Sequence, residues 1–330
     1  LDASFDGDGM VVTDFGEPFE DANAIAIQRD GKIVVGGSAG CGSFALARYN
    51  IDGSLDTSFD GDGKVLTDFG GCDIIKIVAS GETFSPFAYD FAIARYNPDG
   101  GLDTGFGSGG KVTTDFGGYD AANAAALQPD GRIVVVGNGG ANAFLVARYR
   151  TDGSLDPTFD GDGKRTVDFN GYGWASDVAI QSDDKIVVSG FGTFSFLFAL
   201  ARLNGDGSLD ASFDGDGKVT ANPGGDTRKT AVALQVDGCI VLAGTIYHDF
   251  DASFAIVRFD SHGTLDPSFG SGGRVITDFG NPEDVGGLCP AARSDCSEDI
   301  VSDITIQRDG KIIVVGGAGP CTPTCFTALA

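Results

Sequence analysis

The sequence predicts an all-β fold, a six-bladed β-propeller in which each blade is a four-stranded antiparallel sheet. The motif Leu-Asp-x-x-Phe-x-x-x-Gly occurs six times and begins at residues 1, 55, 102, 155, 209 and 265. Repeats of about 50 residues that contain several short apolar strands are typical of propeller blades. Because the repeats fill the chain of 330 residues without a linker, we expect a single domain over residues 1–330.

The first repeat shows how we expect one blade to form. Residues 24–28 follow the two-residue period of a strand, and a β-branched run follows at 32–36. Asp30-Gly31 between them favours a type I′ hairpin turn, because glycine accepts a positive φ. A third strand is expected at 44–49 and a fourth at 64–69, which completes the sheet.

Consecutive apolar residues predict that both faces of each sheet are covered. The runs 133–136 and 312–315 have no polar position, as expected of strands buried between neighbouring blades. Residues 10–15 resemble a fourth strand, whereas the chain ends with the first three strands of the sixth repeat. We therefore expect the two ends to pair in one composite blade that closes the ring. The last motif, 326–330, stops one residue before its Arg, which indicates a fragment of a longer polypeptide.

Two repeats depart from the pattern. The second spans only residues 55–101, and the chain between Phe69 and Lys76 is too short for a complete inner strand with its turn. The sixth carries an insertion over about 281–299. Irregular loops on a regular scaffold are where specialised contacts are expected.

Four motifs recur in fixed order: Leu-Asp-x-Ser-Phe, Gly-Lys-Val-x-Thr-Asp-Phe-Gly, Leu-Gln-x-Asp-Gly-Lys-Ile-Val-Val and Leu-Ala-Arg-Tyr-Asn-x-Asp-Gly. Together they resemble the delta-60 repeat, a bacterial β-propeller repeat of large secreted or surface-attached proteins. The resemblance covers essentially the whole chain. It implies a propeller fold and an extracellular or cell-surface setting, and it implies no general enzymatic activity. The shortened second repeat departs from the family pattern.

The charge of the chain argues against two classes of partner. A formal net charge of −25 repels phosphate backbones, so we expect no nucleic acid partner. No apolar stretch reaches the roughly 20 residues of a membrane helix, so we expect no membrane insertion.

Seven cysteines without a Cys-x-x-Cys pair suggest disulfides in an oxidising compartment. Cys41 and Cys72 are expected on the same rim of the propeller, where they can pair. The sixth repeat offers two bridges with three connectivities. Cys239 is left over, and the alternative is that all are reduced thiols. The disulfide candidates are Cys41, Cys72, Cys289, Cys296, Cys321 and Cys325.

Acidic, glycine-rich loops follow the third strands and have two interpretations. They resemble the oxygen cages that calcium prefers. Alternatively, their Asp side chains cap turns and their glycines supply positive φ, and two repeats read Gly-Ser-Gly-Gly instead. No cofactor is required under either interpretation. The candidate calcium ligands are Asp6, Asp8, Asp52, Asp56, Asp60, Asp62, Asp160, Asp162, Asp214 and Asp216.

The sequence shows no catalytic motif, and we predict that the chain is not an enzyme. Its two His residues lie in loops without a Ser or Cys nucleophile nearby. The Arg of each third strand, such as Arg48, is expected to pair with a loop carboxylate rather than to bind an anion. Trp174, the single Trp, is expected to pack against a neighbouring blade or to cap the channel, with ligand contact as the alternative.

We therefore expect an extracellular structural or adhesive module, such as a subunit of a surface fibre or sheath. It would contact a protein partner or a second copy through its rim loops. The alternative is a propeller that binds a glycan or another small ligand. A hydrolase that uses a pair of carboxylates is a third hypothesis, since sequence does not place carboxylates in space.

Overall fold

The computed structural model describes residues 11, 13–16, 20–28, 30–39, 43–67, 74–76, 80–85, 88–97, 101–140, 142–193, 196–248, 251–278, 300–307, 310–318 and 326–329. All of its regular elements are β-strands, as predicted. The chain divides into two compact units. The first comprises residues 1–140 and 147–156, and the second comprises residues 141–146 and 157–330, so that the division falls within one strand.

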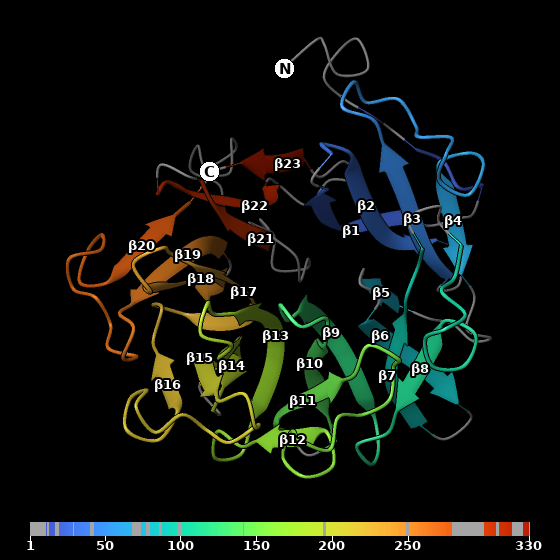
Figure 1. Cartoon of the computed structure of the whole chain (residues 1–330). Coiled ribbons are helices and arrows are strands. Elements are labelled where there is room, and N and C mark those ends of the chain that lie inside the picture. Colours follow the sequence, from blue (N-terminus) through green and yellow to red (C-terminus); the bar gives the residue numbers. More distant parts are fainter. Residues whose placement is uncertain are drawn as a thin grey trace, which may run out of the picture. The chain divides into compact units, whose positions relative to one another are not determined.

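The strands form antiparallel sheets in which they follow their order in the chain, and the outer strand of each four-stranded sheet comes from the start of the next repeat (Figure 1). The first sheet contains β1 (Glu20–Ile27), β2 (Ile33–Ala39), β3 (Ser43–Tyr49) and β4 (Lys64–Thr67). The second contains β5 (Ile74–Lys76), β6 (Ser80–Ser85), β7 (Ala88–Ala94) and β8 (Lys111–Thr114). The third contains β9 (Asp120–Leu127), β10 (Ile133–Gly139), β11 (Phe144–Tyr149) and β12 (Lys164–Val167). The three residues of β5 agree with the short inner strand expected of the second repeat.

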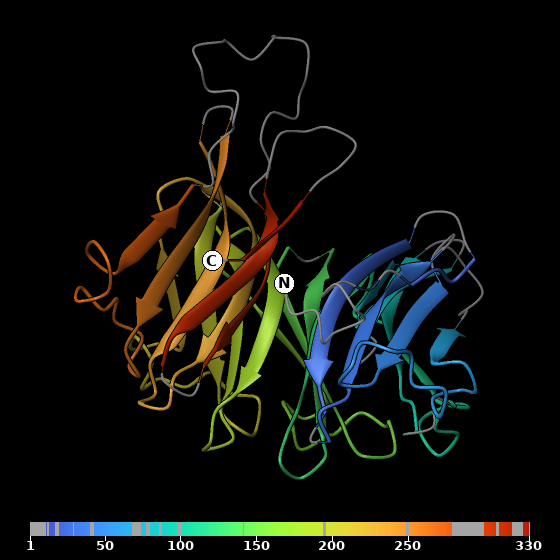
Figure 2. The ribbon, with the colours of Figure 1, turned by 90° about the horizontal axis from the view of Figure 1, so that it is seen from above.

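The second unit contains the remaining sheets. The fourth consists of β13 (Gly173–Ile180), β14 (Ile186–Gly192), β15 (Leu197–Leu203) and β16 (Lys218–Ala221). The fifth consists of β17 (Asp226–Leu234), β18 (Ile240–His248), β19 (Asp251–Phe259) and β20 (Arg274–Thr277). Figure 2 shows β17, β18 and β19 side by side in yellow and orange. The sixth consists of β21 (Ile300–Ile306), β22 (Ile312–Ala318) and β23 (Phe326–Leu329).

The predicted composite blade is not present among the described residues. In the part of the chain that the structure describes, β23 pairs with β22 on one side only, so the sixth sheet has three strands instead of the expected four. The prediction of six four-stranded blades in a closed ring is therefore confirmed only as an array of antiparallel sheets. The insertion at 281–299 lies outside the described residues.

The hairpin turns differ from the predicted type I′. Gly31 N–H donates to the Gln28 carbonyl, Gln28 N–H donates to the Lys32 carbonyl, and Gly31 has φ 87°. Asp30 is not among the residues with positive φ. The third repeat shows the same bonds around residues 129–131, where Gly131 has φ 85°. A single positive φ at the end of three enclosed residues is typical of a three-residue loop, which a two-residue interpretation of Asp-Gly misses. In the fourth repeat Asp184 takes the left-handed position with φ 64°.

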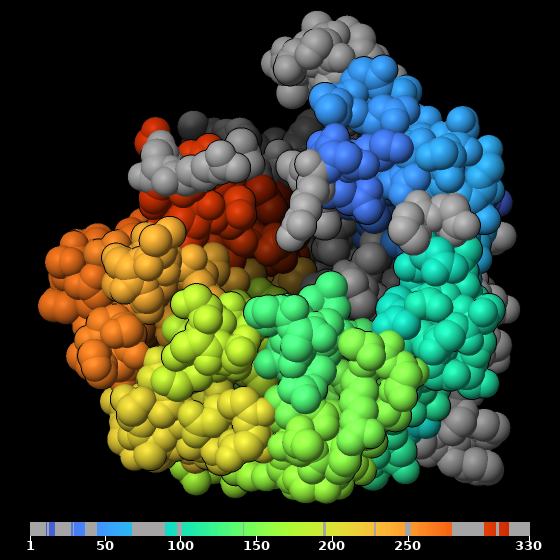
Figure 3. Space-filling view, in the orientation of Figure 1, coloured from blue at the N-terminus to red at the C-terminus, as the bar shows by residue number. Residues whose placement is uncertain are grey.

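Stacked sheets bury the apolar strands, as the consecutive apolar runs predict. All seven residues of β14 are buried. In the second unit Phe198 and Val187 of the fourth sheet pack in one cluster with Leu242 and Val257 of the fifth. A further cluster joins the fifth sheet to the sixth. In Figure 3 the atoms of the fourth and fifth sheets, coloured yellow-green to orange, lie next to one another on the face shown. No helix in the described residues is long and apolar enough to cross a membrane.

The recurring Leu-Asp-x-x-Phe motif closes the connection from the third strand to the fourth. Leu55 bridges Tyr49, Asp56 pairs with Arg48 at 2.7 Å, and the Arg48 guanidinium lies 4.6 Å from the centre of the Phe59 ring. This confirms that the repeated Arg pairs with a loop carboxylate. The other pairs are Arg95–Asp103, Arg148–Asp156, Arg202–Asp210 and Arg258–Asp266.

The innermost strand of most sheets carries a β-bulge near its start. The register shifts between Ala22 and Ala24 in β1, and similar shifts occur in β9, β13, β17 and β21. A bulge turns the bulged residue out of the regular alternation and is common beside binding sites. The bulges therefore draw attention to the inner ends of the sheets.

Candidate functional site

The predicted calcium ligands lie in turns and hold their own loops together. Asp52 Oδ1 accepts the Ser54 N–H at 3.0 Å, and Asp62 Oδ1 accepts the Lys64 N–H at 2.8 Å. Asp56 instead forms its ion pair with Arg48. Such contacts agree with the turn interpretation. In the same way, Asp162 Oδ1 accepts the Lys164 N–H and Asp216 Oδ1 accepts the Lys218 N–H. Asp160 pairs with Arg165, and Asp210 accepts a hydrogen bond from Arg202. The residues with positive φ in these loops are Asp60, Asp160 and Asp214.

Calcium binding by these loops stays a prediction, and Asp6 and Asp8 lie outside the described residues. The six cysteines proposed to form disulfides also lie outside them: Cys41, Cys72, Cys289, Cys296, Cys321 and Cys325. Cys239, expected to be left over, is a free and partly exposed thiol. Burial and the neighbouring Asp237 raise the pKa of that thiol, which keeps it protonated.

Trp174 is the outermost member of an aromatic surface in the second unit, formed by Tyr172, Trp174, Phe191 and Phe196. Trp174 on β13 lies directly opposite Phe191 on β14. Their rings are 5.8 Å apart and nearly parallel, at 15°. Tyr172 is 6.2 Å from Phe191, and the Phe196 ring meets Tyr172 edge-on at 5.4 Å. Trp174 remains 38% exposed although Phe191 is only 6% exposed.

Backbone strain accompanies the aromatic surface. Thr193 and Phe196, in the connection from β14 to β15, have φ 67° and 45°. Both residues are unusual in this left-handed region, which costs roughly 1–3 kcal/mol each and is concentrated at binding sites. Thr193 N–H donates to the Tyr172 carbonyl, and Thr227 N–H donates to the Phe196 carbonyl. Each of these two residues is thus held by a backbone hydrogen bond, and the Phe196 ring contacts Phe191, which in turn stacks on Trp174.

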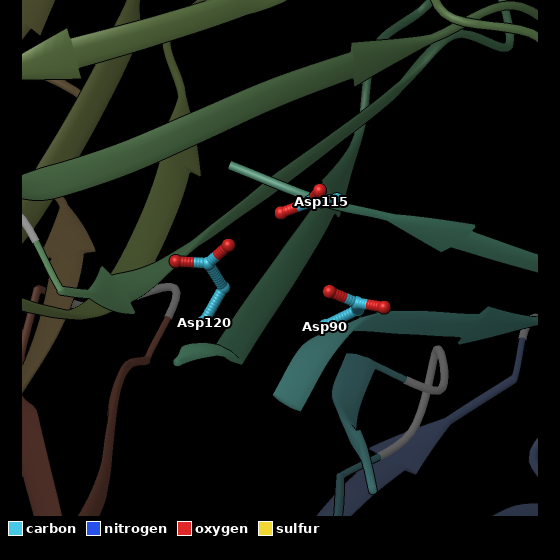
Figure 4. A group of neighbouring side chains, drawn as sticks. All are labelled: Asp90, Asp115 and Asp120. Atoms are coloured by element: carbon cyan, nitrogen blue, oxygen red, sulfur yellow. The ribbon is translucent and has the colours of Figure 1, made fainter. Parts of the chain in front are cut away.

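Three carboxylates meet in the first unit (Figure 4). Asp90 lies on β7, Asp115 follows β8, and Asp120 begins β9. Each offers one oxygen within 4.8 Å of the others. Asp120 is only 1% exposed and accepts the Phe116 N–H at 2.6 Å. Asp90 Oδ1 is buried without a hydrogen-bond partner.

The environment of the carboxylate cluster favours protonation. Burial, followed by the charge of Asp115, raises the pKa of Asp90. Burial also raises the pKa of Asp120, and the charges of Asp115 and Asp90 add to that effect. Close carboxylates of this kind can share protons, or can supply three of the six to eight oxygen ligands that calcium takes. Of the described acidic residues, Asp90, Asp115 and Asp120 are the ones grouped so that they could hold a metal ion.

Asp120→Asn is expected to stabilise the protein near neutral pH. A raised folded-state pKa means that stability is complete at low pH and falls as pH rises from the unfolded value of about 3.9 through the folded value. The Asn side chain keeps the acceptor for Phe116 and removes a charge. Urea unfolding should show a higher midpoint than the parent at neutral pH and no difference below about pH 3.9. Asp162→Asn, in an exposed turn, should show no such gain, and equal gains in both variants would contradict this explanation.

Sequence analysis did not identify the carboxylate cluster, although a comparison of the repeats shows a carboxylate at an unusual position. Asp90 precedes the first β7 residue that pairs with the outer strand, a place taken by Ser43 and Ser253 in other sheets. Asp120 begins its inner strand, as the acidic residues Glu20 and Asp226 begin theirs. The unusual carboxylate is therefore Asp90, which joins Asp120 and Asp115, and Asp115 recurs in most repeats.

Comparison with known proteins gives the class of the fold. Five segments match the model of a family described as a domain of unknown function (DUF5122) beta-propeller: residues 28–59, 76–106, 128–159, 181–213 and 235–269. Five of the six repeats thus match a β-propeller repeat family. The finer name, delta-60 repeat, stays a resemblance. No curated protein matches the chain in sequence.

Solved structures with a similar fold are distant in sequence. A protein of unknown function from Bacteroides caccae is 14% identical, with a TM-score of 0.46 over 79% of this chain and 88% of its own. A gluconolactonase from Xanthomonas campestris is 15% identical, with a TM-score of 0.45 over 93% and 85%. An exo-1,5-alpha-L-arabinanase from a bovine ruminal metagenomic library is 10% identical, with a TM-score of 0.41 over 93% and 90%.

These structures correct one prediction. We predicted that the chain is not an enzyme, on the basis of its missing motifs and its resemblance to a non-catalytic repeat. That prediction is wrong as an inference from the architecture, because structures similar to this chain include a gluconolactonase and an arabinanase. The likeness concerns the fold and assigns neither activity to this chain.

Proposed function

We propose that this β-propeller repeat protein binds glycans, and that the aromatic surface receives a sugar ring. One observation carries the proposal: the indole of Trp174 is 38% exposed while it lies parallel to a buried Phe191. A flat, rigid aromatic face of this kind matches the apolar C–H face of a pyranose ring. The strained Thr193 and Phe196 support it, because such backbone conformations cluster at binding sites.

The structural or adhesive role that we first expected has less support. The exposed indole of Trp174 supports ligand binding more directly than it supports a structural role. An extracellular setting, calcium and contacts with a protein partner or a second copy therefore stay predictions. They are compatible with a protein that binds glycans at a cell surface.

Trp174→Ala is expected to weaken glycan binding at least tenfold, a free-energy difference of about 1.4 kcal/mol. Binding would be measured on a panel of immobilised glycans and then by calorimetry on the best of them. Leu127→Ala is the matched control, because Leu127 is also an exposed apolar residue, at 60%, and lies in the first unit. Equal affinity in the Trp174 variant and the parent would refute a site at the aromatic surface.

We also propose that the six repeats form one closed domain, with residues 10–13 as the outer strand of the sixth sheet. Thr13 Oγ1 contacts the Tyr49 hydroxyl at 2.5 Å, as the outer-strand Thr67 and Thr114 contact Tyr96 and Tyr149 of the next sheet. Lys64 Nζ donates to the Asp14 carbonyl at 2.9 Å, like Lys218 to Asp168 at 3.1 Å. Residues 13–15 thus have the contacts of an outer strand.

The register of the first sheet makes the closure testable. Phe44 pairs with Thr67 and Ala45 with Leu66, so the same offset would pair Thr327 with Thr13 and Ala328 with Val12. We expect Val12→Cys with Ala328→Cys to form an intrachain disulfide, because opposite residues lie within bonding reach. Peptide mapping would detect it. Val12→Cys with Ile276→Cys should not link, and equal linkage of both pairs would contradict the register.

A further inference from the structure

In the fourth sheet, a turn of the fifth sheet covers the connection between the third and fourth strands. Arg202 Nη1 donates to the Ser261 carbonyl at 2.6 Å, and Asp214 N–H donates to the His262 carbonyl at 2.7 Å. Ser261 and His262 belong to the turn that follows β19 in the fifth sheet. The Phe213 ring lies 4.6 Å from the Arg202 guanidinium and is 0% exposed. The turn after one third strand thus docks on the connection of the preceding sheet.

The same docking contacts recur in two further sheets. In the second sheet, Arg95 Nη1 donates to the Thr151 carbonyl at 2.5 Å, and Phe106 is 0% exposed. Phe159 of the third sheet is also 0% exposed. The corresponding backbone bonds run from Gly107 N–H to the Asp152 carbonyl and from Asp160 N–H to the Asp206 carbonyl, each at 2.8 Å. An Arg, a backbone N–H and a buried Phe therefore define a docking site for a turn.

A left-handed glycine lets the docked turn approach closely. Gly263 has φ 89°, and a Cβ built there would lie 3.0 Å from the Phe213 ring. Gly207 has φ 87°, and a Cβ there would lie 2.9 Å from the Asp160 nitrogen. A side chain at this position would therefore displace the turn from its docking site.

The equivalent docking site of the fifth sheet, formed by Arg258, Asp266, Phe269 and Gly270, has no such cover. Arg258 Nε donates to Asp266 at 2.8 Å, and the guanidinium lies 4.7 Å from the centre of the Phe269 ring. Within the described part of the chain, Arg258 Nη1 and the Gly270 N–H have no hydrogen-bond partner. Phe269 is partly exposed, whereas Phe213 is fully buried. The two donors that bind a turn in other sheets are thus available here.

Strand register identifies the segment that would cover this site. The fourth residue of β18 pairs with Ile256, and the fourth residue of β22 pairs with Leu329. Leu329 of the sixth sheet therefore holds the place of Ile256 of the fifth. Ser261 follows Ile256 by five residues, so the corresponding residue would follow Leu329 by five. An apolar cluster joins the fifth sheet to the sixth, as expected if a turn of the sixth covers a site on the fifth.

We propose that the docking site of the fifth sheet binds the Asp-Gly turn that follows β23 in the longer polypeptide. Its backbone carbonyls accept hydrogen bonds from Arg258 Nη1 and from the Gly270 N–H, and its glycine lies against the Phe269 ring. Hydrogen bonds from a charged donor are among the stronger polar contacts in proteins, and burial of an aromatic ring adds to them. The occupant is thus a segment of the same polypeptide, of the kind Arg-Leu-Asn-Gly-Asp-Gly found at 202–207.

The test compares the chain that ends at Ala330 with a chain extended after Ala330 by Arg-Leu-Asn-Gly-Asp-Gly. Hydrogen exchange of single amides would be followed by NMR. We expect the Gly270 amide to exchange at least tenfold more slowly in the extended chain, because it gains the carbonyl partner that Gly107 has in Asp152. The Ser271 amide already donates to the Arg274 carbonyl, and its exchange should be unchanged.

A second extension, Arg-Leu-Asn-Gly-Asp-Val, is the matched control. Its final side chain would meet the Phe269 ring, so the Gly270 amide should exchange as fast as in the parent. Equal Gly270 exchange in the parent and the first extended chain, or equal protection by both extensions, would overturn the proposal. Protection in the parent that grows with protein concentration would also overturn it, because a second copy would then supply the turn.

Discussion

Asp156→Ala is expected to lower the free energy of unfolding by about 3–5 kcal/mol. Asp156 is 1% exposed and accepts the Arg148 Nε–H at 2.9 Å, and Arg148 is itself 2% exposed. The Nε atom of Arg132 approaches the same carboxylate to 3.1 Å. Removal of the carboxylate leaves a buried guanidinium without its compensating charge, and this penalty exceeds the net value of the pair. Urea unfolding followed by circular dichroism would measure the loss.

The second sheet supplies a matched control. Asp103 holds the equivalent position and pairs with Arg95 at 2.7 Å, but the two side chains are 29% and 30% exposed. Because exposed pairs contribute roughly 0–1 kcal/mol, Asp103→Ala should change stability by no more than that. Equal losses in the two variants would show that burial does not determine the contribution of this repeated pair.

Gly190→Ala is expected to destabilise the protein by about 3 kcal/mol and to weaken glycan binding as well. A Cβ at this position would lie 2.0 Å from the Trp174 carbonyl oxygen and 2.9 Å from the Ala175 Cα. This close approach arises where the register shifts between Ala175 and Asp177. The backbone of β13 would have to move, and Trp174 would move with it. Urea unfolding and glycan binding would be measured on the same preparation.

Gly205→Ala is the control for this substitution. No atom lies within 4 Å of a Cβ built at Gly205, and its φ is not in the left-handed region. The change should therefore stay within about 0.5 kcal/mol of the parent. A stable Gly190→Ala variant with unchanged glycan affinity would contradict the proposed coupling between the bulge in β13 and the aromatic surface.

Periodic features of the chain were predictable. The expected strands at 44–49 and 64–69 correspond to β3 and β4, because alternation, turn residues and repetition indicate the same structure in every copy. The pairing of Arg48 with a loop carboxylate was also predictable, since a charge repeated in every blade needs a repeated partner. The type of hairpin turn could not be predicted, because Asp-Gly occurs both in two-residue loops and at the end of three-residue loops.

The candidate sites depend on distances between repeats that periodicity does not contain. Asp90 and Asp120 are 30 positions apart and become neighbours only when β7 and β9 are placed in space. Trp174 was singled out as the single Trp, but its parallel contact with Phe191 follows from the register of β13 against β14.

The most direct measurement of the central claim is the fluorescence of Trp174, since the chain has a single Trp. A sugar ring that covers the indole should shift its emission to shorter wavelength and protect it from acrylamide quenching. Both effects should saturate at the affinity found by calorimetry. Glycan binding detected by calorimetry without any change in the emission or quenching of Trp174 would contradict the claim that the aromatic surface is the binding site.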